Sequence, residues 1–475
     1  MLLETAREQF IAQNLEEYGG DAIDLAWVTP EEARRAEDER RGLLATLADA
    51  VLTAANGSKL YTNALSPGCR TCCAGTWSCL FINGICNARC FYCPTSQLSK
   101  SEPTTNNLRF PKPRDYISYL EKFGIRGASI SGGEPLMTLD RTLNFLARIK
   151  EHFGAAIHLW MYTNGILLTS DILKRLQDTG LDEIRFDISA NSYRLDKVEM
   201  AVGKIPQVTV EIPTVPEDAD QLLAAMRELD RLGVNFLNLH QLRLTPHNRP
   251  QLAGRNYTYL HGPRVTVLES ELAALRLLAV AVRERLRLAV NYCSYIYKFR
   301  YQTMAARRRS AAFINKPHES ITATGLLRTL TVRAAAAELQ NLVADFTSRG
   351  LPADLWQFNS AAATLHLAPQ LLHHLDPRRH SLSVRYHAAA LKPAITYHNS
   401  YREIELSSRR RLIVERTPLD TELAVAADKL PLFTGKIMPD DATPWPETSP
   451  GGNQPTDWEK IVASESFRAG LYEYY

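Results

Sequence analysis

Three cysteines in one nine-residue stretch, Cys86-Asn-Ala-Arg-Cys90-Phe-Tyr-Cys93-Pro, constrain this chain more than any other feature. Thiolates spaced four and three residues apart can converge from a single loop on one metal centre, because soft sulfur ligands select iron–sulfur clusters, zinc or copper(I). A 4Fe-4S cluster normally takes four cysteines, so three ligands leave one iron available to another molecule. An open metal site indicates chemistry, whereas a closed one indicates a structural role.

Length and composition narrow the classes of function. The chain has 475 residues, more than a usual single domain, so we expect two or three domains. Its 55 basic and 52 acidic residues give a net charge of +3, which favours neither nucleic acid nor a membrane surface as a partner. The first residues lack the basic and apolar segments of a signal peptide, and no stretch is long and apolar enough to span a membrane. We therefore expect a soluble, cytoplasmic protein.

Apolar strands alternate with helical stretches from residue 110 onward. Together with an earlier strand, the predicted strands are residues 76–83, 127–131, 157–162, 183–189, 208–213, 236–241 and 288–298. This alternation predicts an α/β fold, a parallel sheet that right-handed crossovers would curl into a full or partial (β/α) barrel. In such sheets functional residues gather at the carboxyl ends of the strands.

Polar residues follow the predicted strands at that edge. Gly132-Gly133-Glu134-Pro135 follows the second strand, where the glycines would let the backbone approach a ligand and the glutamate could accept a hydrogen bond from an ammonium group. Asn164 follows the third strand, Asp187 and Ser189 end the fourth, and His240 ends the sixth. A hydrogen-bonded structural histidine is the alternative interpretation of His240. Alone, Gly-Gly-Glu-Pro is typical of an ordinary turn. After a three-cysteine loop it indicates a binding site.

The cysteine spacing, with an aromatic residue before Cys93, resembles the signature of the radical SAM superfamily, and residues 132–135 resemble its second motif. The resemblance covers about residues 77–244. It implies that Cys86, Cys90 and Cys93 hold a 4Fe-4S cluster whose open iron binds S-adenosylmethionine (SAM). Reductive cleavage of SAM would then release a 5′-deoxyadenosyl radical that abstracts hydrogen from a substrate C–H bond. A flavodoxin or ferredoxin would be the electron donor.

The resemblance also assigns roles in SAM binding. Residues 132–135 would hold the amino group, the backbone of Tyr92 would lie near the adenine, and the end of the fourth strand would bind the ribose. The stretch 210–214 departs from the looser glycine motif of the family, so no adenine contact is assigned there. The residues that this resemblance makes candidates for cofactor binding are Tyr92, Gly132, Gly133, Glu134, Pro135, Asn164, Asp187, Ser189 and His240.

Further cysteines precede the loop. Cys69 and Cys72 have the spacing of a metal knuckle, and Cys79 is within reach, so an auxiliary iron or zinc site is one interpretation of them. The alternative is that these thiols, with Cys73, are buried small hydrophobes. Cys293 lies far from the others in sequence. It could complete an auxiliary site or, as the candidate catalytic residue, give a hydrogen atom to a substrate radical.

The run Cys293-Ser-x-x-Tyr-Lys298 and the extra cysteines are similar to a radical SAM subgroup related to methanogen protein-arginine C-methyltransferases. This similarity implies methylation of a peptide or protein residue and leaves open whether cobalamin is a further cofactor, because the chain has no Asp-x-His-x-x-Gly motif. Rearrangement, epimerisation or bond formation on a small molecule is the alternative within the superfamily. A non-catalytic zinc-binding module is the alternative of another class.

The composition changes along the chain predict four regions. We expect a helical extension over residues 1–60, the barrel over 61–310, and a small α+β accessory domain over 318–430 that covers the barrel mouth and selects the substrate. Residues 431–475 would form an extended proline-rich tail, docked by Tyr472, Tyr474 and Tyr475.

Overall fold

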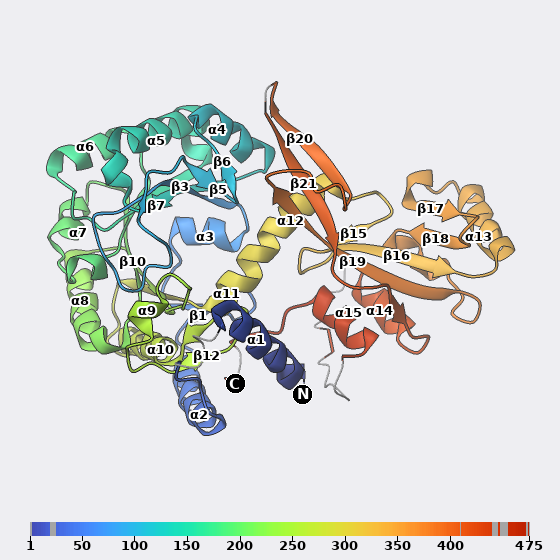
Figure 1. The fold of residues 1–475 in the computed structure, drawn as a ribbon, viewed down its shortest axis with the longest axis horizontal. Helices are drawn as coiled ribbons and strands as arrows, with labels where there is room; N and C mark the ends of the chain where they lie inside the picture. The colour runs from blue at the N-terminus through green and yellow to red at the C-terminus, as the bar shows by residue number, and fades with distance from the viewer. Residues whose placement is uncertain are drawn as a thin grey trace. The chain divides into compact units, whose positions relative to one another are not determined.

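A computed structural model describes residues 2–19, 25–408, 410–438, 445–446, 455–471 and 474 (Figure 1). The chain forms two compact units. The barrel unit comprises Arg7–Gln302 and Ala469–Tyr475, and the accessory unit comprises Met1–Ala6 and Thr303–Arg468. Among the described residues, no helix has the length and apolar character needed to cross a membrane.

The barrel unit is organised around one large, mostly parallel sheet. Its strands are β1 (Leu52–Ala54), β2 (Lys59–Tyr61), β3 (Trp77–Ile85), β4 (Leu98–Ser99), β5 (Thr104–Thr105), β6 (Leu108–Arg109), β7 (Gly127–Gly132), β8 (His158–Thr163), β9 (Glu183–Phe186), β10 (Gln207–Pro213), β11 (Phe236–His240) and β14 (Ala289–Cys293). In the described chain seven neighbours, β3-β7-β8-β9-β10-β11-β14, run parallel. The antiparallel strands β2 and β5 flank this set, and the strand pairings of the described residues do not close the sheet into a ring. The expected α/β fold with a partial barrel is therefore confirmed.

Helices between the parallel strands cover the outer face of the sheet, as Figure 1 shows. The helices of this unit are α1 (Leu2–Tyr18, in this unit from Arg7 on), α2 (Pro30–Leu47), α3 (Pro67–Cys73), α4 (Pro113–Lys122), α5 (Leu139–Phe153), α6 (Ser170–Asp178), α7 (Asp196–Ala201), α8 (Ala219–Leu232), α9 (Arg249–Leu252), α10 (Leu268–Arg283) and α11 (Tyr295–Tyr297), with a π-helix η6 (Lys298–Gln302). A small pair of strands, β12 (Tyr259–Leu260) and β13 (Thr266–Val267), lies outside the large sheet. Helix α8 is typical of the covering helices: it buries Leu222, Met226 and Leu229, which share one face at helical spacing.

Helix α3 differs from the covering helices because it lies on the concave side of the sheet (Figure 1). Gly68 lies so close to the strands that a Cβ there would be 2.3 Å from Arg185 Nη2. The helix thereby brings its cysteines into the interior of the barrel unit.

The N-terminal region contributes more than the helical extension expected for residues 1–60. Strand β2 pairs antiparallel with β14, and its residue Lys59 is the register partner of Cys293. The β1–β2 turn has positive φ at Ala55, Asn56 and Gly57. Asn-Gly is a strong hairpin signal, and it explains why a strand pair forms in a region where we expected helices alone.

The accessory unit is an α+β unit, as expected. Its elements are α12 (Thr303–Ile314), β15 (Ser320–Ile321), β16 (Leu327–Arg333), α13 (Ala336–Ser348), β17 (Trp356–Asn359), β18 (Thr364–Leu367), β19 (Ser381–Lys392), β20 (Tyr401–Ser407), β21 (Arg410–Pro418), β22 (Leu423–Val425), α14 (Leu430–Lys436) and α15 (Asp457–Glu465). Within the described residues its strands form one antiparallel sheet. Leu330, Phe346, Val384 and Phe433 lie in its buried core.

The boundaries differ from the expected ones in two places. Helix α12 belongs to the accessory unit, whereas we expected the barrel to continue to residue 310. The region 431–475, expected as an extended tail, contains most of α14 and all of α15. A capping box between Thr456 and Glu459 begins α15 and accounts for this helix. Residues 439–444, 447–454, 472, 473 and 475 lie outside the described residues, and with them Tyr472 and Tyr475.

Candidate active site at the cysteine loop

Strand β3 leads directly into the cysteine loop, and the Gly-Gly-Glu-Pro turn lies against this junction. Gly133 N donates to Asn83 O at 3.1 Å, and Glu134 N donates to Ile85 O at 2.7 Å. A Cβ on Gly133 would lie 1.9 Å from Ile85 O, and Gly132 has a φ of +130°. The two glycines are therefore required because the turn packs on the chain's own backbone beside Cys86, whereas we had assigned their small size to a ligand.

The Glu134 side chain ties together the ends of β7 and β8. Its carboxylate accepts hydrogen bonds from Leu136 N at 3.0 Å, Thr163 Oγ1 at 2.9 Å and Asn164 N at 2.7 Å. The residue is 1% exposed, and burial raises its pKa to about 7. These internal donors occupy the carboxylate that we expected to receive an ammonium group.

Hydrogen-bond donors point at the sulfurs of the loop. Gln97 Nε2 donates to Cys93 Sγ at 2.7 Å. Asn164 Nδ2 lies 3.6 Å from Cys86 Sγ, and Ala88 N lies 3.4 Å from the same sulfur. Such donors stabilise thiolate ligands and tune the potential of an iron–sulfur cluster. The loop therefore fits the cluster chemistry expected of its three cysteines.

Tyr92 connects the cysteine loop to the end of β9. Its hydroxyl lies 2.9 Å from Asp187 Oδ2 and 2.7 Å from Ser189 Oγ, and Ser189 Oγ donates to Asp187 Oδ1 at 2.6 Å. Burial raises the pKa of Asp187. Three residues that we predicted separately thus form one contact group at the carboxyl edge of the sheet.

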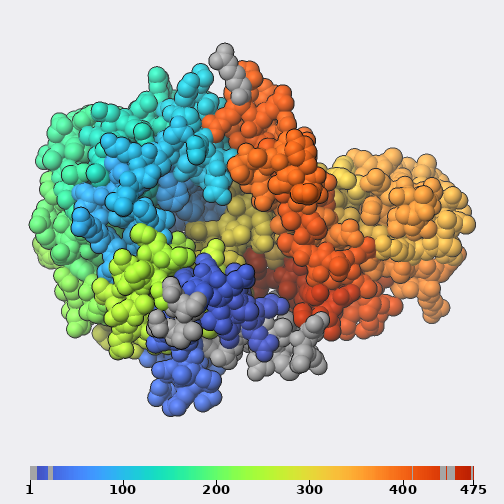
Figure 2. All heavy atoms as spheres, in the orientation of Figure 1, coloured from blue at the N-terminus to red at the C-terminus, as the bar shows by residue number. Residues whose placement is uncertain are grey.

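A segment that sequence reasoning missed lies against the loop. Thr245 Oγ1 donates to Pro94 O at 3.2 Å, and Asn248 Nδ2 donates to Tyr92 O at 3.1 Å. Figure 2 shows these regions, light blue and yellow-green, side by side on the visible face. Thr245 and Asn248 also bond reciprocally, from each backbone amide to the other's side chain. This Thr-x-x-Asn pattern was the available signal for the segment.

His240, expected near the adenine, contacts the sheet interior. Its Nδ1 faces Lys298 Nζ, and its Nε2 lies 2.9 Å from Glu211 Oε1. Burial and the Lys298 ammonium lower the pKa of His240 to about 4. Glu211 also accepts from Asn238 and Arg185. Within the described chain, the partners found for His240 belong to this interior network.

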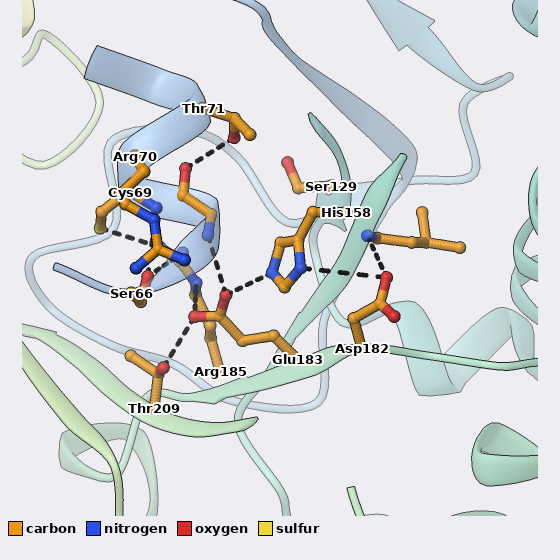
Figure 3. A network of polar contacts seen from close by, with 12 residues as sticks. Ser66, Cys69, Arg70, Thr71, Ser129, His158, Asp182, Glu183, Arg185 and Thr209 are labelled. Carbon is orange, nitrogen blue, oxygen red and sulfur yellow. Dashed lines mark hydrogen bonds and ion pairs between the residues drawn. The ribbon is translucent and has the colours of Figure 1, made fainter. Parts of the chain in front are cut away.

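The interior network continues to α3, as Figure 3 shows. The buried Glu183 carboxylate accepts from Arg185 Nε at 2.8 Å and Thr209 Oγ1 at 2.7 Å, and it pairs with His158 at 2.8 Å. Gly68 N, in α3, lies 3.3 Å from the same carboxylate. These contacts fix α3, and with it three cysteines, against the strands.

The structure separates Cys79 from the other early cysteines. Cys69, Cys72 and Cys73 lie in α3, whereas Cys79 lies in β3, where Ser129 of β7 is its register partner. Among the described residues, no three His, Cys, Asp or Glu side chains are placed to hold a single metal ion. The predicted grouping of Cys69, Cys72 and Cys79 is not supported by this arrangement.

Comparison with known proteins identifies the central domain. A family model described as the radical SAM superfamily matches residues 80–252. A Methanocaldococcus jannaschii protein, assigned by name to the glycyl-radical enzyme activating enzymes, is 29% identical over 275 residues, which are 55% of this chain and 72% of that protein. The GTP 3′,8-cyclase of Limosilactobacillus fermentum is 28% identical over 39% of this chain and 51% of its own length. That of Aliarcobacter butzleri is 33% identical over 22% of this chain and 31% of its own length.

Solved structures give weaker likenesses. SuiB of Streptococcus suis, bound to S-adenosylmethionine, has 13% sequence identity and a TM-score of 0.35 over 62% of this chain and 63% of its own. TsrM of Kitasatospora setae, a radical S-adenosylmethionine methyltransferase, has 15% identity and a TM-score of 0.28 over 37% of this chain and 38% of its own. Together with the cysteine loop and the glycine turn, the family match shows that residues 80–252 of this chain are a radical SAM domain.

Proposed function

We propose that the chain is a radical SAM enzyme whose cluster is held by Cys86, Cys90 and Cys93. The observation that carries this proposal is the meeting of three separate motifs at one sheet edge. The glycine turn is bonded to the backbone that precedes Cys86, and Tyr92 in the loop is bonded to Asp187 at the end of β9.

The residues present fit a 4Fe-4S cluster. Each cysteine of such a cluster binds a different iron, so the thiols need not converge on one point. The absence of a single-ion site among the described residues agrees with this arrangement. When bound, the cluster would supply one electron to the sulfonium of SAM, which gives a 5′-deoxyadenosyl radical able to abstract hydrogen from a C–H bond.

In this proposal, side chains and backbone groups of the chain bind and orient SAM and shield the cysteine loop from solvent. The turn Gly132–Pro135 fixes the loop and presents backbone groups to the SAM amino group. Asp187 and Ser189 accept hydrogen bonds from the ribose hydroxyls of SAM. Thr245 and Asn248 hold the neighbouring segment over the loop and limit access of water and oxygen.

Anaerobic reconstitution with iron and sulfide, followed by reduction with dithionite in the presence of SAM, tests the proposal. We expect a brown protein that releases 5′-deoxyadenosine. Cys90→Ala should release none, whereas the matched variant Cys79→Ala, which removes a cysteine outside the loop, should retain the activity. A brown wild-type protein that makes no 5′-deoxyadenosine, or a colourless one filled with zinc, would refute the assignment. Replacing dithionite with flavodoxin or ferredoxin tests the expected electron donor.

Methylation of a peptide or protein residue is our finer proposal. Its support is the likeness of residues 293–298 and the early cysteines to the methyltransferase subgroup. Cobalamin would carry the methyl group, so the reaction should need added methylcobalamin and replace one hydrogen of a substrate peptide by a methyl group, a gain in mass of one CH2 unit. A product with the same mass as a small-molecule substrate would instead establish rearrangement or epimerisation.

A further inference from the structure

Four cysteines from distant parts of the sequence gather around one buried lysine in the barrel unit. Cys69, Cys72 and Cys73 are spaced i, i+3 and i+4 in α3 and therefore lie on one face of the helix. Cys293 ends β14 and is the register partner of Lys59 in β2. These four thiols lie close enough to the Lys59 ammonium to interact with its charge, as do Lys298 and His240. We call the four cysteines the tetrad.

Side-chain donors from several elements point at the tetrad sulfurs. Tyr297 Oη lies 3.1 Å from Cys72 Sγ and 3.5 Å from Cys73 Sγ. Gln302, in the π-helix η6, donates to Cys72 Sγ at 3.2 Å. π-Helical segments are frequent at functional sites.

Cys69 is surrounded in the same way. Asn238 Nδ2 lies 3.5 Å from its sulfur and Arg185 Nη1 lies 3.8 Å from it, the latter contact being drawn in Figure 3. A neutral thiol is a weak hydrogen-bond acceptor, so it does not account for donors that reach these sulfurs from four different elements. They suit thiolates that bind a metal, because a coordinating thiol is deprotonated.

Lys59 is the second, independent observation. It is 1% exposed, and its Nζ lies 4.5 Å from the centre of the Tyr297 ring. Within the described residues, no carboxylate lies at ion-pair distance from it. A buried ammonium group without a counter-ion is strongly unfavourable. The position therefore calls for an anionic group among the four sulfurs.

We propose that Cys69, Cys72, Cys73 and Cys293 bind a second cluster, of the 4Fe-4S type, closed by four thiolates. Binding releases the four thiol protons to solvent. The four thiolates together carry more negative charge than the oxidised core carries positive charge, so the centre is a net anion that Lys59 balances. Cys69 and Cys293 are 6% and 7% exposed, whereas Cys72 and Cys73 are partly exposed.

The arrangement favours an iron–sulfur cluster over zinc. A zinc ion needs its ligands to converge on one point at about 2.3 Å, and the described residues contain no such convergence. The thiols of a 4Fe-4S cluster bind different irons and lie further apart. This assignment replaces Cys79 with Cys73 as a ligand. It also makes Cys293 a ligand instead of a hydrogen donor.

The decisive test removes the cysteine loop from the measurement. The variant Cys86→Ala, Cys90→Ala, Cys93→Ala is reconstituted anaerobically, and its iron, sulfide and zinc contents are measured together with its EPR spectrum after reduction. We expect about four iron and four sulfide per chain and a cluster signal that SAM does not change. Zinc without sulfide, or no metal above the level of the metal-free protein, would overturn the proposal. The outcome is independent of SAM cleavage, so it stands apart from the proposed function.

Two further variants in the same background identify the ligands. Cys72→Ser with Cys293→Ser should remove the remaining iron, whereas Cys79→Ser should retain it. Retention of iron by the first variant would refute the ligand set. If the background variant fails to fold, the wild-type protein decides: about eight iron per chain and two EPR species, one of them insensitive to SAM, are expected, and a single SAM-sensitive species with about four iron contradicts the tetrad.

Discussion

The two groups of cysteines in the barrel unit differ in ligand number and in surroundings. The cysteine loop offers three thiols on irregular chain after β3, and each is partly exposed. The tetrad offers four thiols on regular elements, of which Cys69 and Cys293 are buried, and Lys59 lies beside them at 1% exposure. An open centre must leave access for a second molecule, whereas a closed centre can be buried and balanced in charge by the protein. The contrast indicates that the number of cysteine ligands and the burial of the site go together: the site with a free ligand position is the more exposed one.

The largest effect should come from Gly133→Ala, which acts on the loop alone. The added Cβ would meet Ile85 O at 1.9 Å, a contact that the backbone must move to relieve. We expect SAM cleavage to fall below detection and the SAM-sensitive EPR signal to disappear, while the tetrad signal remains. Gly254→Ala is the matched control, because a Cβ there meets nothing within 4 Å. Loss of both signals would show that the two regions are not separable.

Lys59→Met should affect the tetrad, and its effect on the free energy of unfolding should have opposite signs in the metal-free and the reconstituted protein. In the metal-free protein it removes a buried ammonium group that has no carboxylate partner among the described residues, so the free energy of unfolding should rise by about 3 kcal/mol. In the reconstituted protein it removes the counter-charge of an anionic centre, and the protein should lose stability. Chemical denaturation of both forms under anaerobic conditions measures this. If the metal-free variant is less stable than the metal-free wild type, Lys59 is not an unbalanced buried charge, and the proposed difference between the tetrad and the loop fails.

The free energy of unfolding should depend on pH because of Glu134, which lies beside the cysteine loop. Burial raises its pKa to about 7, above the value of a free carboxyl group, so the folded protein holds this proton more tightly than the unfolded chain does. The resulting stabilisation is complete below the unfolded pKa and is lost as the pH rises through about 7. Between pH 5 and 8 the metal-free wild type should lose at most about 3 kcal/mol relative to Glu134→Gln. A difference between the two proteins that is constant with pH would exclude this role.

The smallest effects should come from the donors to sulfur. Gln97→Ala removes a donor to Cys93, and Tyr297→Phe removes one shared by Cys72 and Cys73. Each should weaken only its own cluster, by about 10-fold to 100-fold in affinity. Competition with an iron chelator, followed through the two EPR signals, measures both losses. Equal losses of both signals in either variant would mean that the donors serve the fold and not a particular centre.

Much of the parallel sheet could be predicted from the sequence. Seven apolar runs gave the seven parallel strands, because strands buried on both faces are apolar along their length. Strand β9, Glu183–Phe186, is buried throughout although it contains two charged residues. Glu183 and Arg185 bond to each other, which explains how charge is tolerated there.

The candidate site was predictable as a set of residues but not as a set of contacts. The motifs indicated the loop, the glycine turn and Asp187. The motifs did not indicate that the Glu134 carboxylate accepts its hydrogen bonds from the chain itself. Its donors, Leu136, Thr163 and Asn164, come close to it only because β7 and β8 pack side by side. The tetrad was hidden for a similar reason: Lys59 meets Cys293 through a strand pairing that spans most of the barrel sequence.

The last residues of the chain return to the barrel unit after the accessory unit is complete. Tyr474 donates to Glu271 Oε1 at 2.7 Å, and Arg40 lies over its ring at 4.4 Å. Arg40 and Glu271 are themselves buried. On the ribosome, the barrel is thus translated long before the tyrosine that covers this ion pair. Residues Thr303–Arg468 of the accessory unit separate the two segments of the barrel unit in the sequence, so cutting the gene after residue 302 would leave the barrel unit without Tyr474.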